Sequence, residues 1–372
     1  MRGTRRWAAA LLVALAVLAA ACSDGTADDD ASPTTTTTAE PTTSTTAPPA
    51  EPQPVRGPWE RVDAPSTCRC SDGSPYHLYV RRADPARVVF YLEGGGACFS
   101  ADTCGPGNPT YTRDLEGREE PAEVGIFADD ERNPFAGWSM VYVPYCTGDL
   151  HLGDQVQDYG DGVVVRHNGA VNASTALTAM AAAFPDAAQV VVAGSSAGSA
   201  SAPLYGGLAH DLLPDADVTV VADASGAYPR DEVITSAIGA LWGAFQNLPD
   251  WPTSAGEPET AWSLPGLFVR AGRHVPDLDV ATLNNAYDDV QARFSALIGN
   301  GGDLREKIVE NDEWIESQGV EVRSWVAPGT GHTILGRPDF YDAEVDGVQL
   351  HEWLAGVVAD EDVPDVRCTE CR

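Results

Sequence analysis

Ser196 stands where a β-branched run meets a helical pattern, and its neighbours are almost all glycine, alanine or serine. The stretch reads QVVVAGSSAGSASAPLYGG, in which Gly194, Ser196 and Gly198 complete a Gly-x-Ser-x-Gly pattern. Alone, the pattern is common. With a strand before it and a helix after it, it is typical of a nucleophile elbow, whose crowded turn admits only small flanking residues. The sequence therefore predicts that Ser196 is the nucleophile of an acyl-transfer reaction.

A nucleophilic serine needs hydrogen-bond donors for the oxyanion that forms when it attacks a carbonyl. One donor is expected to be the N–H of the residue that follows the nucleophile, Ala197. Three glycines, 94–96, directly follow the apolar run RVVFYL and its glutamate, as in the oxyanion loops of esterases. We expect Gly95 and Gly96 to supply the remaining N–H groups.

A serine hydroxyl becomes reactive when a base removes its proton, and histidine is the usual base. Of the seven histidines, His332 stands in APGTGHTIL, directly after a late apolar run. It is therefore the predicted base. His151, in TGDLHLGD, is expected in a loop on the substrate side.

The acid that orients the histidine depends on how residues 266–285 are divided into elements. If 266–272 (GLFVRAG) form a strand, Asp277 follows it and is the natural acid. If 278–285 (LDVATLNN) form the strand and the preceding residues a helix, Asp288 follows it, with Asp289 next to it. We predict Asp288, and we interpret Asp223 in ADASG as a structural residue near the pocket.

Apolar runs and helical patterns alternate through the rest of the chain, which is typical of a parallel sheet covered on both faces. The expected strands are 87–92, 140–145, 189–194, 217–222 and 322–329, and the expected helices are 172–184, 197–213, 232–247 and 347–358. The sequence thus predicts one α/β domain over residues 58–372.

Six sequence blocks resemble, in order, the pectin acetylesterase and Notum family of α/β-hydrolases. They are FYLEGGGACFS, VYVPYCTGDLHLGD, VVAGSSAGS, ADASGAY, AYDDVQ and PGTGHTIL. The resemblance implies an α/β-hydrolase fold and a serine carboxylesterase that needs neither a metal nor an organic cofactor. Plant members remove acetyl groups from pectin, whereas Notum removes a fatty acyl group from a secreted signalling protein. The family pattern of aromatic, Asp and Gln in AYDDVQ favours Asp288.

One position departs from the family pattern. Members carry a tryptophan directly after the glycines, where this chain has Ala97. Only Gly96 and Ala97 lie between Gly95 and Cys98, so this loop offers little apolar surface, and we expect short acyl chains.

Eight cysteines in a chain expected to be exported favour disulfides. The resemblance implies a bridge between Cys98 and Cys104, and another from Cys146 to either Cys68 or Cys70. The pairing of Cys368 and Cys371 stays open. Apart from the Cys-x-Cys and Cys-x-x-Cys pairs, the cysteine spacings fit no familiar zinc module, so no metal is expected.

The first 57 residues read as an export and anchoring segment. Residues 1–21 combine arginines with an apolar run too short to span a bilayer, as in a signal peptide. LAAAC, which ends at Cys22, resembles a bacterial lipobox, in which the cysteine is lipidated. Residues 22–57 are rich in Thr, Pro and acidic residues and are expected to form a disordered tether. The domain is thus predicted at the outer face of the bacterial cell membrane.

The formal net charge of −32 excludes nucleic acid as a plausible partner, since phosphates require clustered Lys and Arg. The predicted substrate is an O-acyl ester, in the first instance an acetylated carbohydrate or a small ester. Two alternatives are a lipid or protein deacylase and a non-catalytic surface-binding module on a hydrolase scaffold.

Overall fold

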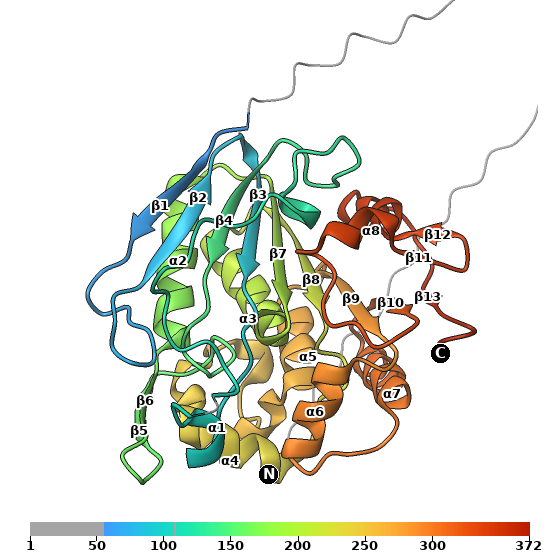
Figure 1. Cartoon of the computed structure of the whole chain (residues 1–372). Helices are drawn as coiled ribbons and strands as arrows, with labels where there is room; N and C mark the ends of the chain where they lie inside the picture. Colours follow the sequence, from blue (N-terminus) through green and yellow to red (C-terminus); the bar gives the residue numbers. More distant parts are fainter. Residues whose placement is uncertain (1–55, 108) are drawn as a thin grey trace, which may run out of the picture. The chain divides into compact units, whose positions relative to one another are not determined.

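A nine-stranded sheet forms the centre of the computed structural model, which describes residues 56–107 and 109–372 (Figure 1). In spatial order the strands are β1 (Trp59–Asp63), β2 (His77–Arg81), β4 (Trp138–Val143), β3 (Asp84–Leu92), β7 (Gln189–Ser195), β8 (Asp217–Asp223), β9 (Asp279–Asn285), β10 (Arg323–Ala327) and β13 (Val366–Arg367). β1 and β2 join by antiparallel pairing, and every neighbouring pair from β4 to β13 is parallel. The expected α/β class and mostly parallel sheet are confirmed.

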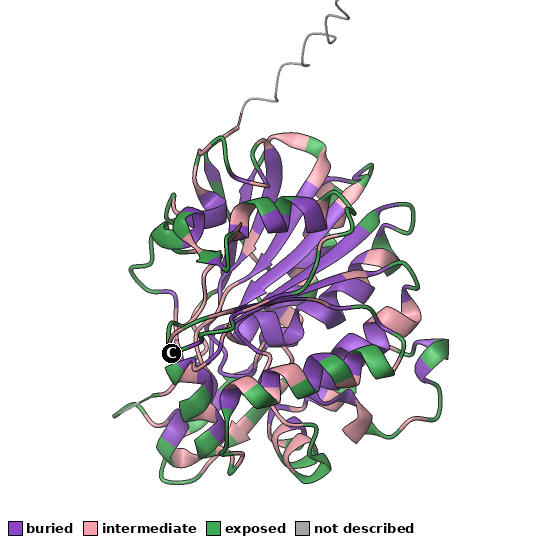
Figure 2. Cartoon of the chain, turned by 90° about the vertical axis from the view of Figure 1, so that its right-hand side faces the viewer, coloured by how far each residue is buried: buried purple, intermediate pink, exposed green. Residues whose placement is uncertain are grey.

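The central strands are apolar throughout because both faces of the sheet are covered. In β3, Val88, Phe90 and Leu92 belong to the core on one face, and Val89 and Tyr91 to the core on the other. Figure 2 shows the strands buried between the outer layers, whose exposed residues face outward. This two-sided burial confirms helices on both faces, as in α/β-hydrolases.

Each face has its own covering elements. One core contains residues of α2 (Gly169–Ala183), α3 (Ala197–Leu212) and α5 (Leu264–His274). The other contains residues of the 3-10 helices η1 (Gly125–Phe127) and η5 (Pro338–Asp342) and of α8 (Leu350–Val358). α7 (Leu304–Ser317) contributes buried residues to both cores. The remaining short elements are α1 (Ala101–Cys104), β5 (Gln155–Asp158), β6 (Val164–His167), η3 (Pro252–Ser254), η4 (Glu259–Trp262), β11 (Glu344–Val345) and β12 (Val348–Gln349).

The residues between β8 and β10 settle the open division of 266–285. α5 begins after Ser263, whose side chain accepts a hydrogen bond from the Gly266 N–H, and β9 is the strand that follows it. Reading 266–272 as a strand was therefore wrong. Asp277 lies exposed between α5 and β9, and α6 (Asp289–Leu297) begins after Asp288.

The helix expected over 232–247 is divided by a glycine. α4 (Glu232–Trp242) ends at Gly243, which adopts a left-handed conformation with φ of 65°, and η2 (Ala244–Asn247) follows. A left-handed residue at this position terminates a helix and costs glycine the least. The change of direction brings α4 and η2 together on one side of the site described below.

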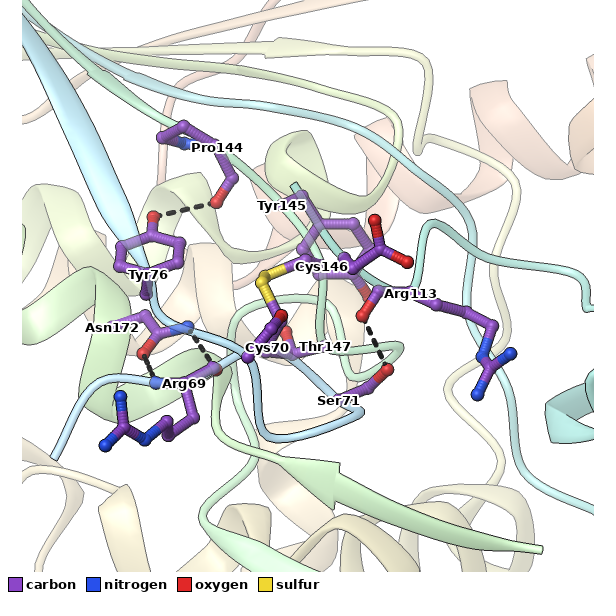
Figure 3. The surroundings of a disulfide bond; sticks show 12 residues. Arg69, Cys70, Ser71, Tyr76, Arg113, Pro144, Tyr145, Cys146, Thr147 and Asn172 are labelled. Carbon is purple, nitrogen blue, oxygen red and sulfur yellow. Dashed lines mark hydrogen bonds between the residues drawn. A yellow bond between two sulfur atoms is a disulfide. The ribbon is translucent and has the colours of Figure 1, made fainter. Parts of the chain in front are cut away.

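Three disulfides are formed: Cys70–Cys146, Cys98–Cys104 and Cys368–Cys371. The first two agree with the expected bridges and identify Cys70, rather than Cys68, as the partner of Cys146. In Figure 3, the Tyr76 hydroxyl beside this bridge donates to the Pro144 carbonyl at 2.8 Å. Among the described residues, Cys68 keeps a free thiol, and it is fully buried. A native disulfide typically contributes about 2–4 kcal/mol to the free energy of unfolding.

Within the described residues, no helix combines the length and the apolar character needed to cross a bilayer. The predicted signal peptide, Cys22 and almost all of the predicted tether lie outside the described residues.

Candidate active site

Ser196 sits in a strained turn between β7 and α3. Its φ of 54° and ψ of −114° place a non-glycine residue in a region that L-residues rarely occupy. A Cβ added to Gly198 would lie 2.0 Å from the Leu92 carbonyl oxygen, and one added to Gly194 would lie 2.4 Å from Gly198. Both flanking glycines are therefore required by close backbone contacts, as the sequence pattern predicts.

Asp288 and His332, which are 44 positions apart, meet through a hydrogen bond of 2.7 Å between His332 Nδ1 and Asp288 Oδ2. The Asp288 carboxylate is fully buried. Its Oδ1 accepts hydrogen bonds from the N–H groups of Val290 (2.8 Å) and Gln291 (3.0 Å), so Asp288 is the N-cap of α6. The Gln291 side-chain amide donates to Oδ2 at 3.2 Å. Three groups besides the histidine therefore fix this carboxylate.

The orientation of Asp288 comes from a helix cap. The sequence predicts only that Asp288 follows the strand over 278–285. In the structure β9 ends at Asn285, and capping of α6 turns the Asp288 carboxylate inward. Asp289 is the first helical residue, and its side chain is exposed. Of the candidate acids, Asp288 alone contacts His332.

The other ring nitrogen of His332, Nε2, is buried and has no hydrogen-bond partner among the described residues. His332 and Ser196 line the same pocket, which is called the polar pocket here because Glu93, Arg118 and Glu119 also line it. A neutral imidazole whose Nδ1–H donates to a carboxylate leaves the Nε2 lone pair free to accept a proton. Catalytic hydrogen bonds are often long before substrate binds. The arrangement suits a base held ready beside a serine.

Three backbone N–H groups near Ser196 remain available to a ligand. Those of Gly95 and Gly96 donate no hydrogen bond within residues 56–107 and 109–372. Ala197 is the first residue of α3, so its N–H lacks an intrahelical acceptor. A Cβ on Gly94 would lie 2.9 Å from the Ser196 Cβ, which shows how closely this loop passes the serine. The predicted oxyanion donors are thus brought to one place.

His151 contacts Glu93, the residue directly before the glycine loop of residues 94–96. Its Nε2 bonds to the carbonyl oxygen of Glu93 at 2.9 Å, and the Tyr145 N–H donates to the Glu93 carboxylate at the same distance. Burial lowers the pKa of His151 to about 4, so the ring is neutral at physiological pH. Leu150 and Leu152, on either side of His151, line a pocket, whereas the His151 side chain is buried in the protein.

A second, apolar pocket also adjoins Ser196. Its apolar wall comes mainly from α3, α4, η2, α5 and α6, and includes Leu204, Leu208, Ile234, Ile238, Trp242, Phe245, Leu248, Leu264, Leu267, Phe294 and Ile298. Sequence reasoning did not find this wall because its residues are scattered over about a hundred positions and carry no reactive group. Ser196 and Gly96 line both pockets, so the two meet at the serine.

Comparison with known proteins identifies relatives of the chain. The family model described as pectinacetylesterase matches residues 59–249. This range includes Gly95, Gly96 and Ser196, whereas Asp288 and His332 lie beyond it.

Curated relatives include two proteins described as palmitoleoyl-protein carboxylesterase NOTUM. The one from Homo sapiens is 34% identical over 91 residues, and the one from Schmidtea mediterranea is 37% identical over 98 residues. The matches cover 23% and 24% of this chain, and 18% of each relative. The matched segments therefore span less than a fifth of these relatives.

The fold is similar to that of a solved structure, the Wnt deacylase Notum from Drosophila. The TM-score is 0.62 at 20% sequence identity, and the alignment covers 83% of this chain and 96% of the other. This likeness extends over almost the whole of the described region and concerns the fold.

Proposed function

Since this chain belongs to the pectinacetylesterase family, we propose that it is an extracytoplasmic serine carboxylesterase that hydrolyses O-acyl esters. The observation that supports this most directly is the hydrogen bond between His332 and Asp288, with Nε2 unpaired among the described residues and with His332 lining the pocket that Ser196 also lines. A buried carboxylate, an oriented imidazole and a serine in a strained turn are the parts of an acyl-transfer triad.

In the proposed reaction, His332 Nε2 removes the hydroxyl proton as Ser196 Oγ attacks the ester carbonyl carbon. The N–H groups of Gly95, Gly96 and Ala197 stabilise the resulting oxyanion. Collapse of the intermediate breaks the ester bond, and the alcohol leaves with the proton held by His332. Water, deprotonated by the same nitrogen, then attacks the acyl carbon; the bond to Ser196 Oγ breaks, the acid leaves, and His332 returns the proton to Ser196 Oγ. Asp288 fixes the His332 tautomer and stabilises the imidazolium throughout.

We assign the alcohol part of the substrate to the polar pocket. Its lining includes Tyr79, Tyr142, Arg118 and Glu93, and these supply aromatic faces together with hydrogen-bond donors and acceptors. Such groups suit a polyhydroxylated alcohol. This lining supports a carbohydrate ester as the substrate.

We assign the acyl part to the apolar pocket. The prediction of a short acyl chain relied on the acetylesterase branch of the family and on the short loop from Gly96 to Ala97. The apolar wall is built by distant elements instead, and an acetyl group would leave most of it uncovered. The pocket therefore favours acyl groups longer than acetyl, which makes a lipid or protein deacylase the second candidate function.

A series of p-nitrophenyl esters from acetate to octanoate tests this assignment. Each buried methylene contributes about 0.8 kcal/mol, so kcat/KM is expected to rise about fourfold per carbon until the pocket is full. The series is read at equal solubility, beside acetate release from acetylated polysaccharides. Fastest turnover of the acetate ester, with release of polysaccharide acetate, would restore the acetylesterase function.

Two variants of α4 locate the effect. Ile238 lines the apolar pocket, whereas Val233 on the same helix is 77% exposed and does not. Ile238→Asn should lower octanoate turnover at least tenfold and change acetate turnover by no more than about twofold. Val233→Asn should leave both rates unchanged. Equal losses on both esters in Ile238→Asn would contradict an acyl site here.

We also propose that residues 1–21 direct export, that lipidated Cys22 anchors the chain, and that residues 22–57 tether the hydrolase domain of residues 58–372. The three disulfides support an oxidising compartment. In the native host, the protein should take up labelled palmitate and fractionate with membranes.

Cys22→Ala should lose both properties, whereas Cys68→Ala, which removes a buried thiol, should retain them. Wild-type protein found unlabelled in the culture supernatant would refute the anchor.

A further inference from the structure

Asp223, the last residue of β8, touches the turn that carries Ser196. It pairs in register with Ser195, and its side chain is buried, with the residue 1% exposed. Its backbone carbonyl accepts a hydrogen bond of 2.7 Å from the Ser196 N–H. Its carboxylate Oδ2 accepts another of 2.6 Å from the Ser195 hydroxyl.

The same carboxylate also touches the loop that carries His332. The Ile334 N–H lies 3.0 and 3.1 Å from its two oxygens, and the Leu335 N–H lies 3.0 Å from Oδ2. Thr333, between these residues and His332, has a φ of 62°, which is unfavourable for a β-branched residue. A strained loop keeps its conformation only when surrounding contacts enforce it.

We propose that Asp223 is a positioning residue that ties the Ser196 turn to the His332 loop and so sets the relation between nucleophile and base. This inference rests on the proposed function for its catalytic meaning, although the contacts themselves do not. Asp288 holds the imidazole ring, and Asp223 holds the backbone that carries it.

Every hydrogen bond of the Asp223 carboxylate described above is donated to it. The Tyr91 hydroxyl donates to Ser195 Oγ at 2.8 Å, so the one proton of the Ser195 hydroxyl is directed to Asp223. Two backbone N–H groups and one hydroxyl thus donate to this carboxylate, and each requires an acceptor. An ionised aspartate satisfies all three, whereas an amide would present its NH2 group to at least one of them.

Ionised Asp223 also places a negative charge near His332. Burial raises the pKa of Asp223, and the hydrogen bonds from Ser195, Ile334 and Leu335 and the proximity of His332 oppose this rise. By reciprocity, the carboxylate favours the protonated imidazole that forms during the reaction. Removal of the charge should therefore move the acid limb of the kcat/KM profile to lower pH.

The test compares Asp223→Asn with Asp312→Asn. Asp312 is also buried and accepts a hydrogen bond from a serine hydroxyl, that of Ser324, at 2.7 Å, but it lines neither pocket. Burial raises the pKa of Asp312 to about 7. The asparagine of the variant is uncharged and therefore resembles the protonated form of Asp312. Asp312→Asn should leave turnover unchanged.

In Asp223→Asn we expect kcat to fall about a hundredfold, as for a misplaced catalytic group, with KM within threefold of wild type. The acid limb should move down by about half a pH unit or more. Hydrogen–deuterium exchange of the amides at 333–335 should accelerate at least about tenfold. Ser195→Ala keeps the carboxylate and should show a smaller loss of kcat, up to about tenfold, with the acid limb in place.

The exchange measurement separates the two proposals because it does not depend on turnover. Unchanged exchange at 333–335 in Asp223→Asn, or a lower kcat without a shift of the acid limb, would overturn the positioning role. If the wild type hydrolyses no ester, the proposed function fails, and exchange still decides whether Asp223 holds the loop. If Asp223→Asn does not fold, Asp223→Glu, which keeps the charge but displaces the carboxylate by one methylene, is measured instead; unchanged exchange at 333–335 in that variant decides against the proposal, and faster exchange supports it.

Discussion

Replacing Ser196 with alanine should lower kcat on a short p-nitrophenyl ester by about a thousandfold or more, because the variant lacks the atom that attacks the carbonyl. The fold should survive. Alanine is smaller than serine, and the turn is held by contacts of Gly194 and Gly198 and by the Ser196 N–H, which alanine keeps. Circular dichroism confirms folding before turnover is measured.

The neighbouring serine provides the matched control. Ser195→Ala removes the same atoms one position earlier, where the hydroxyl bonds to Asp223, and should cost no more than about tenfold. Full activity in Ser196→Ala would end the serine-esterase proposal. A wild-type protein that hydrolyses no ester would instead favour the non-catalytic binding module.

The second large effect is expected for Asp288→Asn, which should lower kcat about ten-thousandfold, as in well-studied triads. The asparagine oxygen can still cap α6 by accepting from Val290 and Gln291. Its NH2 group then faces His332 Nδ1, and a donor there favours the tautomer that carries its proton on Nε2. That tautomer cannot accept the proton of Ser196.

Two nearby aspartates test the assignment of the acid. Asp289 is exposed at the start of α6, and its replacement by asparagine should cost only a few tenths of a kcal/mol, about the value of a charge at a helix N-terminus. Asp277→Asn, in the exposed segment before β9, should change neither stability nor turnover. A crippled Asp289→Asn or Asp277→Asn, beside an active Asp288→Asn, would disprove the assignment.

The sequence predicted the central strands because burial on both faces leaves a continuous apolar run. It did not predict β1, in which only Trp59 is buried, β13, which has two residues, or β2, whose sequence HLYVR mixes polar and apolar residues although all five are buried. β1 and β13 lie at the edges of the sheet and pair with one strand each. Strands without a continuous apolar run are therefore the ones that local composition does not reveal.

In the site, the predicted glycines stand at positions with backbone constraints. The glycines around Ser196 and in 94–96 are required by contacts that no side chain fits, so they are visible in the sequence. The structure brings the predicted Asp288 and His332 together, and N-capping of α6 orients the carboxylate. The apolar pocket and the choice of Cys70 over Cys68 depend on packing between distant segments, which local patterns do not contain.

The buried thiol of Cys68 can be used to measure local unfolding of the protein. Cys68 lies two positions before Cys70, which forms the disulfide with Cys146. The Cys68 Sγ lies 3.4 Å from the Thr175 hydroxyl on α2. Because Cys68 is fully buried, a thiol reagent can reach it only when the surrounding structure opens, so the modification rate reports the free energy of that opening. Cys68 is therefore a natural probe of local unfolding next to the Cys70–Cys146 disulfide, and no engineered label is needed.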